Sequence, residues 1–311
     1  MSRRAWVLFA LVVVLWGIPY FLIKIALRDV SPAMLVWTRV TIGAVTLLPI
    51  AIMTGALKKL RDRIAITLFL GVLEVTAPFV LITAGEGYIS SSLTGILIAT
   101  EPTLVLLFAF WLDATERPDR SRLLGLAVGI IGVALLLGLS VTGSNVVIGG
   151  LMVLGATACY AAGALLIKKR FADVPPIASV TAALLVTSVV LAVPAALTAP
   201  RTFPSADAVG ALLVLGVACT GAGFLCFFAL IKLAGAARAT LITYAAPLIA
   251  VALGVFGRGE SFTVATAAGL ILILAGSWVA GRSSDGGVPN GAIDSSQTAE
   301  EHRTHAGGLR Q

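Results

Sequence analysis

The sequence predicts an all-α integral membrane protein with ten transmembrane helices, arranged as two inverted five-helix repeats. Three observations support this prediction: the composition, a regular succession of long apolar segments, and an internal repeat. Of the 311 residues, 59% are hydrophobic and only 12% are charged, and the mean hydropathy is +1.03. Since a soluble domain has about 25% charged residues, a chain this apolar is suited to lipid rather than to water.

Ten apolar segments each reach about the twenty residues that a membrane-spanning helix needs. These predicted spans are residues 6–27, 32–54, 64–85, 89–111, 122–141, 147–167, 177–198, 208–231, 237–256 and 264–281. The segments are continuous apolar runs, which excludes a transmembrane β-barrel, whose strands alternate polar and apolar residues. The chain is therefore expected to cross the membrane ten times as helices.

The distribution of lysine and arginine predicts the orientation of the chain. With a cytoplasmic N-terminus, seventeen of these residues lie on the inner side and four, Lys24, Arg28, Arg201 and Arg258, on the outer side. Cytoplasmic loops have an excess of positive charge. Both termini are therefore predicted to be cytoplasmic, in a multi-pass protein of a bacterial cell membrane.

Residues 282–311 differ from the rest of the chain, because they are polar and rich in Gly and Ser. This composition predicts a disordered cytoplasmic tail. The pair His302 and His305 in this tail has no other ligand nearby, and the cysteines lie in apolar runs without metal-ligand spacing. We therefore expect no metal site and no cofactor.

The first half of the chain matches the second half with a shift of 144 or 145 residues. With these shifts Asp29 meets Asp173, and Pro102 meets Pro247. The two predicted domains are residues 5–141 and 147–281. Each contains five spans, and since five is an odd number, the second repeat enters the membrane from the opposite side. Inverted repeats of this kind are typical of secondary transporters.

Two matching stretches, residues 88–117 and 233–260, resemble the signature of the EamA family of the drug/metabolite transporter superfamily. In that family a helix with a central Glu-Pro or similar pair, here Glu101-Pro102, leads to a Gly-Glu loop and a Gly-rich fifth helix. The chain departs from the pattern at Thr115-Glu116 and at Ala246. The resemblance implies a transporter, often an exporter of amino acids, metabolites or drugs, and leaves the substrate open.

Three charged residues, Arg39, Glu74 and Glu101, lie inside predicted spans. A charge near the bilayer centre costs on the order of 2.5–3.5 kcal/mol, which makes each a candidate functional residue. Arg39 is always charged, so we expect it to bind substrate and to pair with Glu101 or Glu74; the structural alternative is an ion pair that fixes its helix. Glu101 and Glu74 are the candidate proton-coupling residues, since a carboxyl at mid-depth can be neutral or charged as water reaches it.

Four aromatic residues complete the predicted substrate site. Trp16 and Tyr20 share one face of the first span, at i and i+4. Tyr160 is the repeat partner of Trp16, and Tyr244 lies two residues before the position that matches Glu101. The alternative for these side chains is helix packing.

The sequence therefore predicts a secondary transporter that exports a small, amino-acid-like metabolite by alternating access, driven by protons or by the solute's own gradient. Efflux of cationic drugs or dyes is the alternative, because Trp16, Tyr20 and Glu101 would suit an organic cation. A membrane enzyme or a channel is remote, and no nucleotide-binding P-loop is present. The expected partners are a small molecule and the lipid bilayer, with no nucleic acid, and the protein is a monomer or a homodimer.

Overall fold

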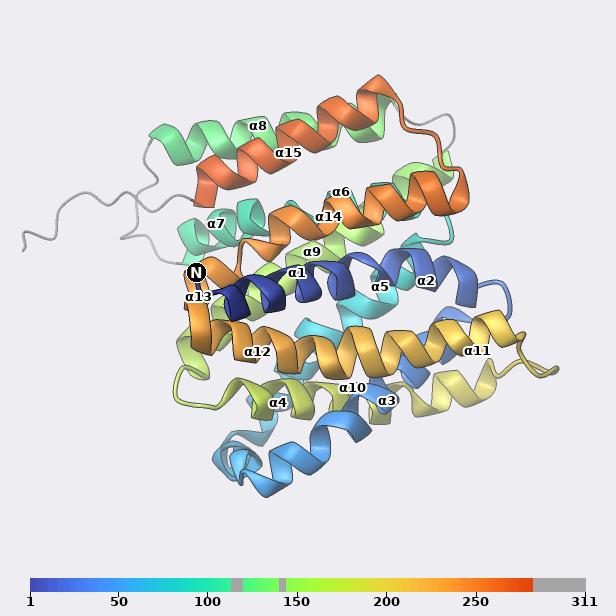
Figure 1. Ribbon diagram of the computed structural model, residues 1–311, viewed down its shortest axis with the longest axis vertical. Coiled ribbons are helices and arrows are strands. Elements are labelled where there is room, and N and C mark those ends of the chain that lie inside the picture. The colour runs from blue at the N-terminus through green and yellow to red at the C-terminus, as the bar shows by residue number, and fades with distance from the viewer. Residues whose placement is uncertain (113–119, 140–143, 282–311) are drawn as a thin grey trace, which may run out of the picture. The chain divides into compact units, whose positions relative to one another are not determined.

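The computed structural model describes residues 1–112, 120–139 and 144–281 (Figure 1). Within these ranges all regular elements are helices, which confirms the predicted all-α class. Eight helical segments are long and apolar enough to cross a membrane by length and composition, and two shorter apolar helices follow at Ile242–Gly257 and Val264–Val279. The predicted tail, 282–311, lies outside the described residues.

The first half of the chain follows the predicted spans, but three of them are divided. Its elements are α1 (Arg3–Gly17), α2 (Pro19–Ala26), α3 (Pro32–Met53), η1 (Ala56–Arg63), α4 (Ile64–Gly71), η2 (Val72–Thr76), α5 (Ala77–Gly85), α6 (Ser91–Ile98), α7 (Glu101–Leu112) and α8 (Arg120–Leu139). Proline lacks the backbone N–H that an α-helix needs. The first span is accordingly divided before Pro19, and the fourth is divided just before Glu101-Pro102.

The second half has the same succession of long segments. Its elements are α9 (Ser144–Arg170), α10 (Pro176–Leu197), α11 (Ala206–Leu213), η3 (Val214–Ala222), α12 (Gly223–Ala234), α13 (Ala236–Ala239), α14 (Ile242–Ala252), η4 (Leu253–Gly257) and α15 (Val264–Gly281). The predicted span 237–256 is divided between α13, α14 and η4.

Two π-helical segments, η2 and η3, occupy matching positions in the two halves. In η2 the hydroxyl group of Thr76 donates to the carbonyl of Gly71 at 3.3 Å, and in η3 that of Thr220 donates to the carbonyl of Leu215 at 2.8 Å. Both bonds reach back five residues, and the two threonines are repeat partners at a shift of 144. In η2, Pro78 cannot donate to the carbonyl of Glu74, which helps to explain why the α-helical pattern is interrupted there.

Helices of the first half pack mainly against helices of the second half. α8 lies beside α15, α3 beside α10, α5 beside α9, and α1 beside α12 and α14 (Figure 1). The contact of α8 with α15 depends on glycine: a Cβ atom at Gly276 would lie 2.5 Å from the backbone nitrogen of Gly129 and 2.7 Å from the carbonyl oxygen of Gly125. These small residues therefore form a packing seam within the chain.

Polar contacts join the two halves at the helix ends as well. Asp29, after α2, accepts hydrogen bonds from the backbone N–H and the hydroxyl group of Ser205, which is the N-cap of α11. Its repeat partner Asp173, before α10, binds both terminal nitrogens of Arg63 at 2.7 and 2.9 Å. The same aspartate position thus ties the halves together twice, with different partners.

Candidate substrate site between the two halves

Arg39 lies about two turns into α3, which packs against η3. Its Nε atom donates a 3.0 Å hydrogen bond to the hydroxyl oxygen of Thr220. Its guanidinium carbon stands 4.3 Å from the centre of the Phe79 ring, within the range of a cation–π interaction. One edge of the guanidinium is therefore fixed by the protein, which positions the rest of the group.

The expected ion pair between Arg39 and Glu101 or Glu74 is wrong. Among the described residues, acidic and basic groups approach within 4.0 Å only at Arg63–Asp173 and at Arg258–Glu260. Arg39 is instead turned toward the hydroxyl group of Thr220 and the face of Phe79. Within the described ranges no acidic group neutralises its charge. A guanidinium in this position is energetically unfavourable unless another group supplies a negative charge.

Glu74 lies in η2 and faces α9. Its carboxyl group occupies the space that a side chain at Gly163 would need, so this glycine makes room for it. Glu74 and Glu101 are close enough to repel each other electrostatically. The structure thus brings the two predicted coupling residues into one region, with Glu101 placed at the start of α7 where the fourth span is interrupted.

Tyr20 of α2 and Tyr160 of α9 lie close enough to the arginine and to the acidic residues to interact with both electrostatically. Both tyrosines interact electrostatically with Arg39 and with Glu101, and with each other. Each of these four residues is partly exposed, and they come from four different helices, α2, α3, α7 and α9. The structure therefore gathers five of the seven predicted site residues, Glu74 included, into one polar cluster, which we call the central cluster.

The remaining two predicted site residues make other contacts. Trp16 packs in an aromatic group on α12, with ring centres 5.6 Å from Phe224 and 4.8 Å from Phe227. The hydroxyl group of Tyr244 donates to the backbone carbonyl of Ser277 at 3.1 Å and so ties α14 to α15. These contacts agree with the helix-packing alternative for both side chains.

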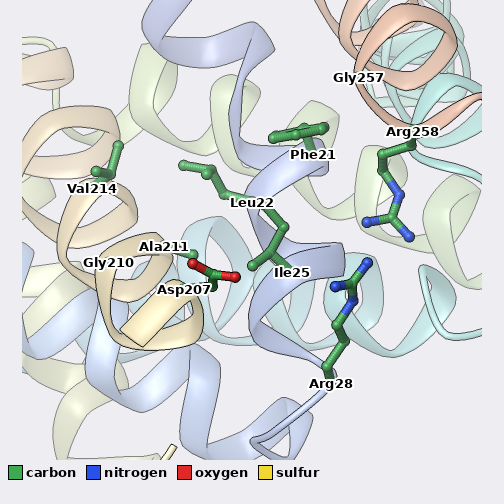
Figure 2. Close-up of a pocket in the computed structure, with 10 residues that line it drawn as sticks. All are labelled: Phe21, Leu22, Ile25, Arg28, Asp207, Gly210, Ala211, Val214, Gly257 and Arg258. Carbon is green, nitrogen blue, oxygen red and sulfur yellow. The ribbon is translucent and has the colours of Figure 1, made fainter. Parts of the chain in front are cut away.

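A separate cavity of about 450 Å³ opens beside α2 and α11. Figure 2 shows the side chains of Arg28 and Arg258 directed toward one another at one end of it, with Asp207 and apolar residues of α2 nearby. None of the predicted site residues lines this cavity. It lies at the face that the charge distribution predicts to be outer.

Comparison with known proteins identifies the family. The model of the EamA-like transporter family matches this chain twice, at residues 4–138 and 147–282. The chain belongs to the EamA-like transporter family. It is thus a multi-pass membrane transporter, as the resemblance implied.

Several relatives of this family member span most of the chain. An uncharacterized transporter of Bacillus subtilis, YvbV, is 29% identical over 277 residues, covering 88% of this chain and 90% of its own length. A probable amino-acid metabolite efflux pump of Salmonella typhimurium is 26% identical and covers 90% and 95%. A solved crystal structure at 23% identity has a TM-score of 0.64 and covers 90% of this chain and 98% of its own, which supports the fold.

Sequence reasoning missed three residues around the central cluster: Phe79, Thr220 and Glu86. Thr220 could have been found, because it is the repeat partner of Thr76. Glu86 was overlooked because it falls in the three-residue gap between two predicted spans, where a charge is ordinary. The motif residue Glu116 lies outside the described residues, whereas its partner Glu260 binds the start of α6.

Proposed function

We propose that this EamA-family member is a secondary transporter that exports a small, amino-acid-like metabolite by alternating access, with coupling to protons. The observation that supports the substrate class is the unpaired charge of Arg39. A guanidinium with one edge fixed by Thr220 and Phe79 presents its other nitrogens as a preorganised donor for a carboxylate. A bound anion would also supply the partner that the described protein residues do not.

An amino acid has a second charge, and the central cluster offers a place for it. Glu74 and Glu101 are acidic groups in the same cluster as Arg39, and Tyr160 interacts electrostatically with all three. An ionised carboxylate would attract the ammonium group of the substrate, and a protonated one would release it. Competition between a proton and the substrate ammonium for these carboxylates is the coupling that we propose.

We also propose the arrangement that alternating access requires. The domains are residues 5–141 and 147–281, inverted relative to each other, with ten spans and both termini in the cytoplasm of a bacterial cell. The double match of the family model, the paired π-helices and the bacterial relatives support this arrangement. Rocking of one repeat against the other would expose the central cluster to each side in turn.

Efflux of cationic drugs or dyes remains the second candidate. The carboxyl groups of Glu74 and Glu101 favour it, because no basic side chain among the described residues lies within 4.0 Å of them and they would attract an organic cation without Arg39. The relative from Salmonella typhimurium, named as an amino-acid metabolite efflux pump, favours the first candidate.

Uptake and counterflow in proteoliposomes test the proposal. The panel contains amino acids, sugars and organic cations, measured at two pH values with the wild type, Glu101→Gln and the control Asp207→Asn, an exposed carboxylate far from the cluster in sequence. We expect saturable counterflow of an amino acid, with a pH response that Glu101→Gln loses and Asp207→Asn keeps. Movement of organic cations alone would replace the substrate class, and an equal pH response in all three proteins would remove Glu101 from coupling.

A further inference from the structure

Glu86 is a buried acidic residue to which the proposed transport cycle assigns no role. It follows α5 directly, and its backbone N–H continues the helix by donating to the carbonyl of Ile82 at 2.9 Å. The residue is 0% exposed. Neither carboxyl oxygen has a hydrogen-bond partner in the part of the chain that the structure describes. An ionised carboxylate in such a place is strongly unfavourable.

The charged groups around Glu86 do not provide an ion-pair partner for its carboxyl group. Lys24 on α2 donates its ammonium hydrogen bond to the backbone carbonyl of Glu86 and not to the carboxyl group. Arg39 on α3, and Arg258 and Glu260 after η4, also act on Glu86 electrostatically. Among the described residues none of these cations comes within 4.0 Å of its carboxyl oxygens.

A second carboxylate, that of Glu260, bonds two segments together on the side of the protein where Glu86 lies. Glu260 accepts hydrogen bonds from the backbone N–H and the hydroxyl group of Ser91 at 2.9 and 2.6 Å, and from those of Ser92 at 3.0 and 2.6 Å. Gly259, with φ at +66°, makes the turn that returns Glu260 to the start of α6. This link joins the loop before α15 to the N-terminal end of α6, which begins five residues after Glu86.

The two carboxyl groups differ in their protonation. Burial raises the pKa of Glu86 well above its ordinary value, although Lys24 acts in the other direction. Burial also acts to raise the pKa of Glu260, but the hydrogen bonds from Ser91 and Ser92 outweigh it and lower that pKa. Glu260 is therefore ionised and fully bonded, whereas the buried Glu86 is the group that holds a proton.

We propose that Glu86 is a proton-binding site loaded from the face that Glu260 closes, and that this face closes only when the Glu86 carboxyl group is protonated. When the bonds of Glu260 to Ser91 and Ser92 break, water reaches Glu86. Its O–H proton then passes to water, and the ammonium group of Lys24 shifts from the backbone carbonyl to the new carboxylate. Closing reverses both steps. The assignment of this face to the outside rests on the proposed function; the proton site itself does not.

Infrared difference spectroscopy of the purified full-length protein, titrated with pH and without any transport substrate, tests the site. We expect a protonated-carboxyl signal that is lost in Glu86→Gln, kept in the control Asp207→Asn, whose carboxylate is exposed, and shifted but present in Glu86→Asp. In Lys24→Met the midpoint should rise by about one pH unit or more, since a positive charge is removed. An unchanged signal in both Glu86 variants would overturn the proposal. Loss of the signal on adding sodium chloride, but not choline chloride, would make it a sodium site instead.

Cysteine labelling tests the consequence for closure. Val251, 9% exposed, packs against α6 about one helical turn before Gly254, and Phe262 is 48% exposed on the same face. Each residue is changed to cysteine in a variant whose three native cysteines are replaced by alanine. The labelling rate of Phe262→Cys, measured at each pH, corrects for the pH dependence of the thiol reagent itself. Corrected labelling of Val251→Cys should rise several-fold with pH in the wild-type background and stay low with Glu86→Gln. Equal pH dependence in both backgrounds would overturn the proposal, whatever the outcome of the transport assay.

Discussion

The two halves of this transporter share a backbone plan but not their chemistry. The charged residues of the central cluster, Arg39, Glu74 and Glu101, all belong to the first half. The matching positions in the second half are uncharged: with a repeat shift of 144 residues they are Ala183, Ala218 and Ala245, and with 145 residues Leu184, Cys219 and Ala246. The second half contributes Thr220, Tyr160 and the space at Gly163.

The paired threonines show how one local structure has been given two uses. Thr76 and Thr220 each bind the carbonyl five residues earlier in a π-helical segment. Thr76 also bonds to the hydroxyl group of Thr187 at 2.8 Å, whereas Thr220 accepts the hydrogen bond of Arg39. The two halves thus share this local structure, but that of the second half binds a charged side chain of the central cluster across the interface, and that of the first half binds a neutral one.

The largest effect is expected from removing the positive charge of Arg39 in the central cluster, which has no charged counterpart at the matching position of the second half. If Arg39 binds the substrate carboxylate, Arg39→Gln should reduce counterflow of the transported amino acid by about 100-fold, because a hydrogen bond to a charged group contributes roughly 1.5–3 kcal/mol. Arg39→Lys should recover only part of the loss, since it lacks the planar fork. Initial rates in proteoliposomes measure both, and near-normal rates in Arg39→Gln would give the arginine a structural role.

Variants of Thr220 and Thr76 should distinguish a loss of transport from a loss of stability. Thr220→Val removes the fixed partner of Arg39, and we expect about a tenfold loss of transport. Thr76→Val removes the neutral contact with Thr187 and should lower the free energy of unfolding by about 1 kcal/mol with little loss of transport. The same counterflow assay and an unfolding titration in detergent compare them. Similar transport losses in both variants would contradict the asymmetry.

Much of this fold, but less of the site, could be predicted from the sequence. Apolar runs locate the spans well, because a bilayer imposes the length and the composition of each helix. Which face of a helix meets which neighbour is a tertiary property. Arg39 was therefore expected to meet an acid and instead meets Thr220 and Phe79, and Trp16 and Tyr244 pack with α12 and α15.

We expect position 163 to require glycine because any larger side chain there would overlap the carboxyl group of Glu74. Gly163→Ala places a methyl group where the carboxyl group of Glu74 lies, and overpacking of this kind typically costs about 1–3 kcal/mol. Gly155→Ala on the same helix is the matched control, because its new methyl group would meet only Leu81, at 3.6 Å. If unfolding in detergent shows equal stability for the two variants, Glu74 is free to move away from α9.

The smallest effect is expected at the exposed contact of Asp173. Its hydrogen bonds with Arg63 lower its pKa. A carboxyl whose pKa is lowered on folding stabilises the protein above the pKa of the unfolded chain, and this contribution is lost as pH falls through the folded pKa. Asp173→Asn should therefore lower the unfolding midpoint by about 1 °C at neutral pH, because the pair is exposed, and this difference from the wild type should disappear as pH falls through the folded pKa. Thermal unfolding of both proteins from neutral to acidic pH measures this, and a difference that persists or grows in acid would contradict it.

The seam between α8 and α15 has a consequence for how the protein is made. α8 finishes the first half, but its glycine face is covered by α15, which is the last helix in the part of the chain that the structure describes. Everything from α9 to η4 is synthesised in between, which takes on the order of ten seconds at cellular rates. During that interval Gly125, Gly129 and Gly132 face lipid or a provisional neighbour. The seam is therefore closed only after α15 has been made, and a chain cut short before α15 would leave the glycine face of α8 uncovered and accessible to quality-control proteases.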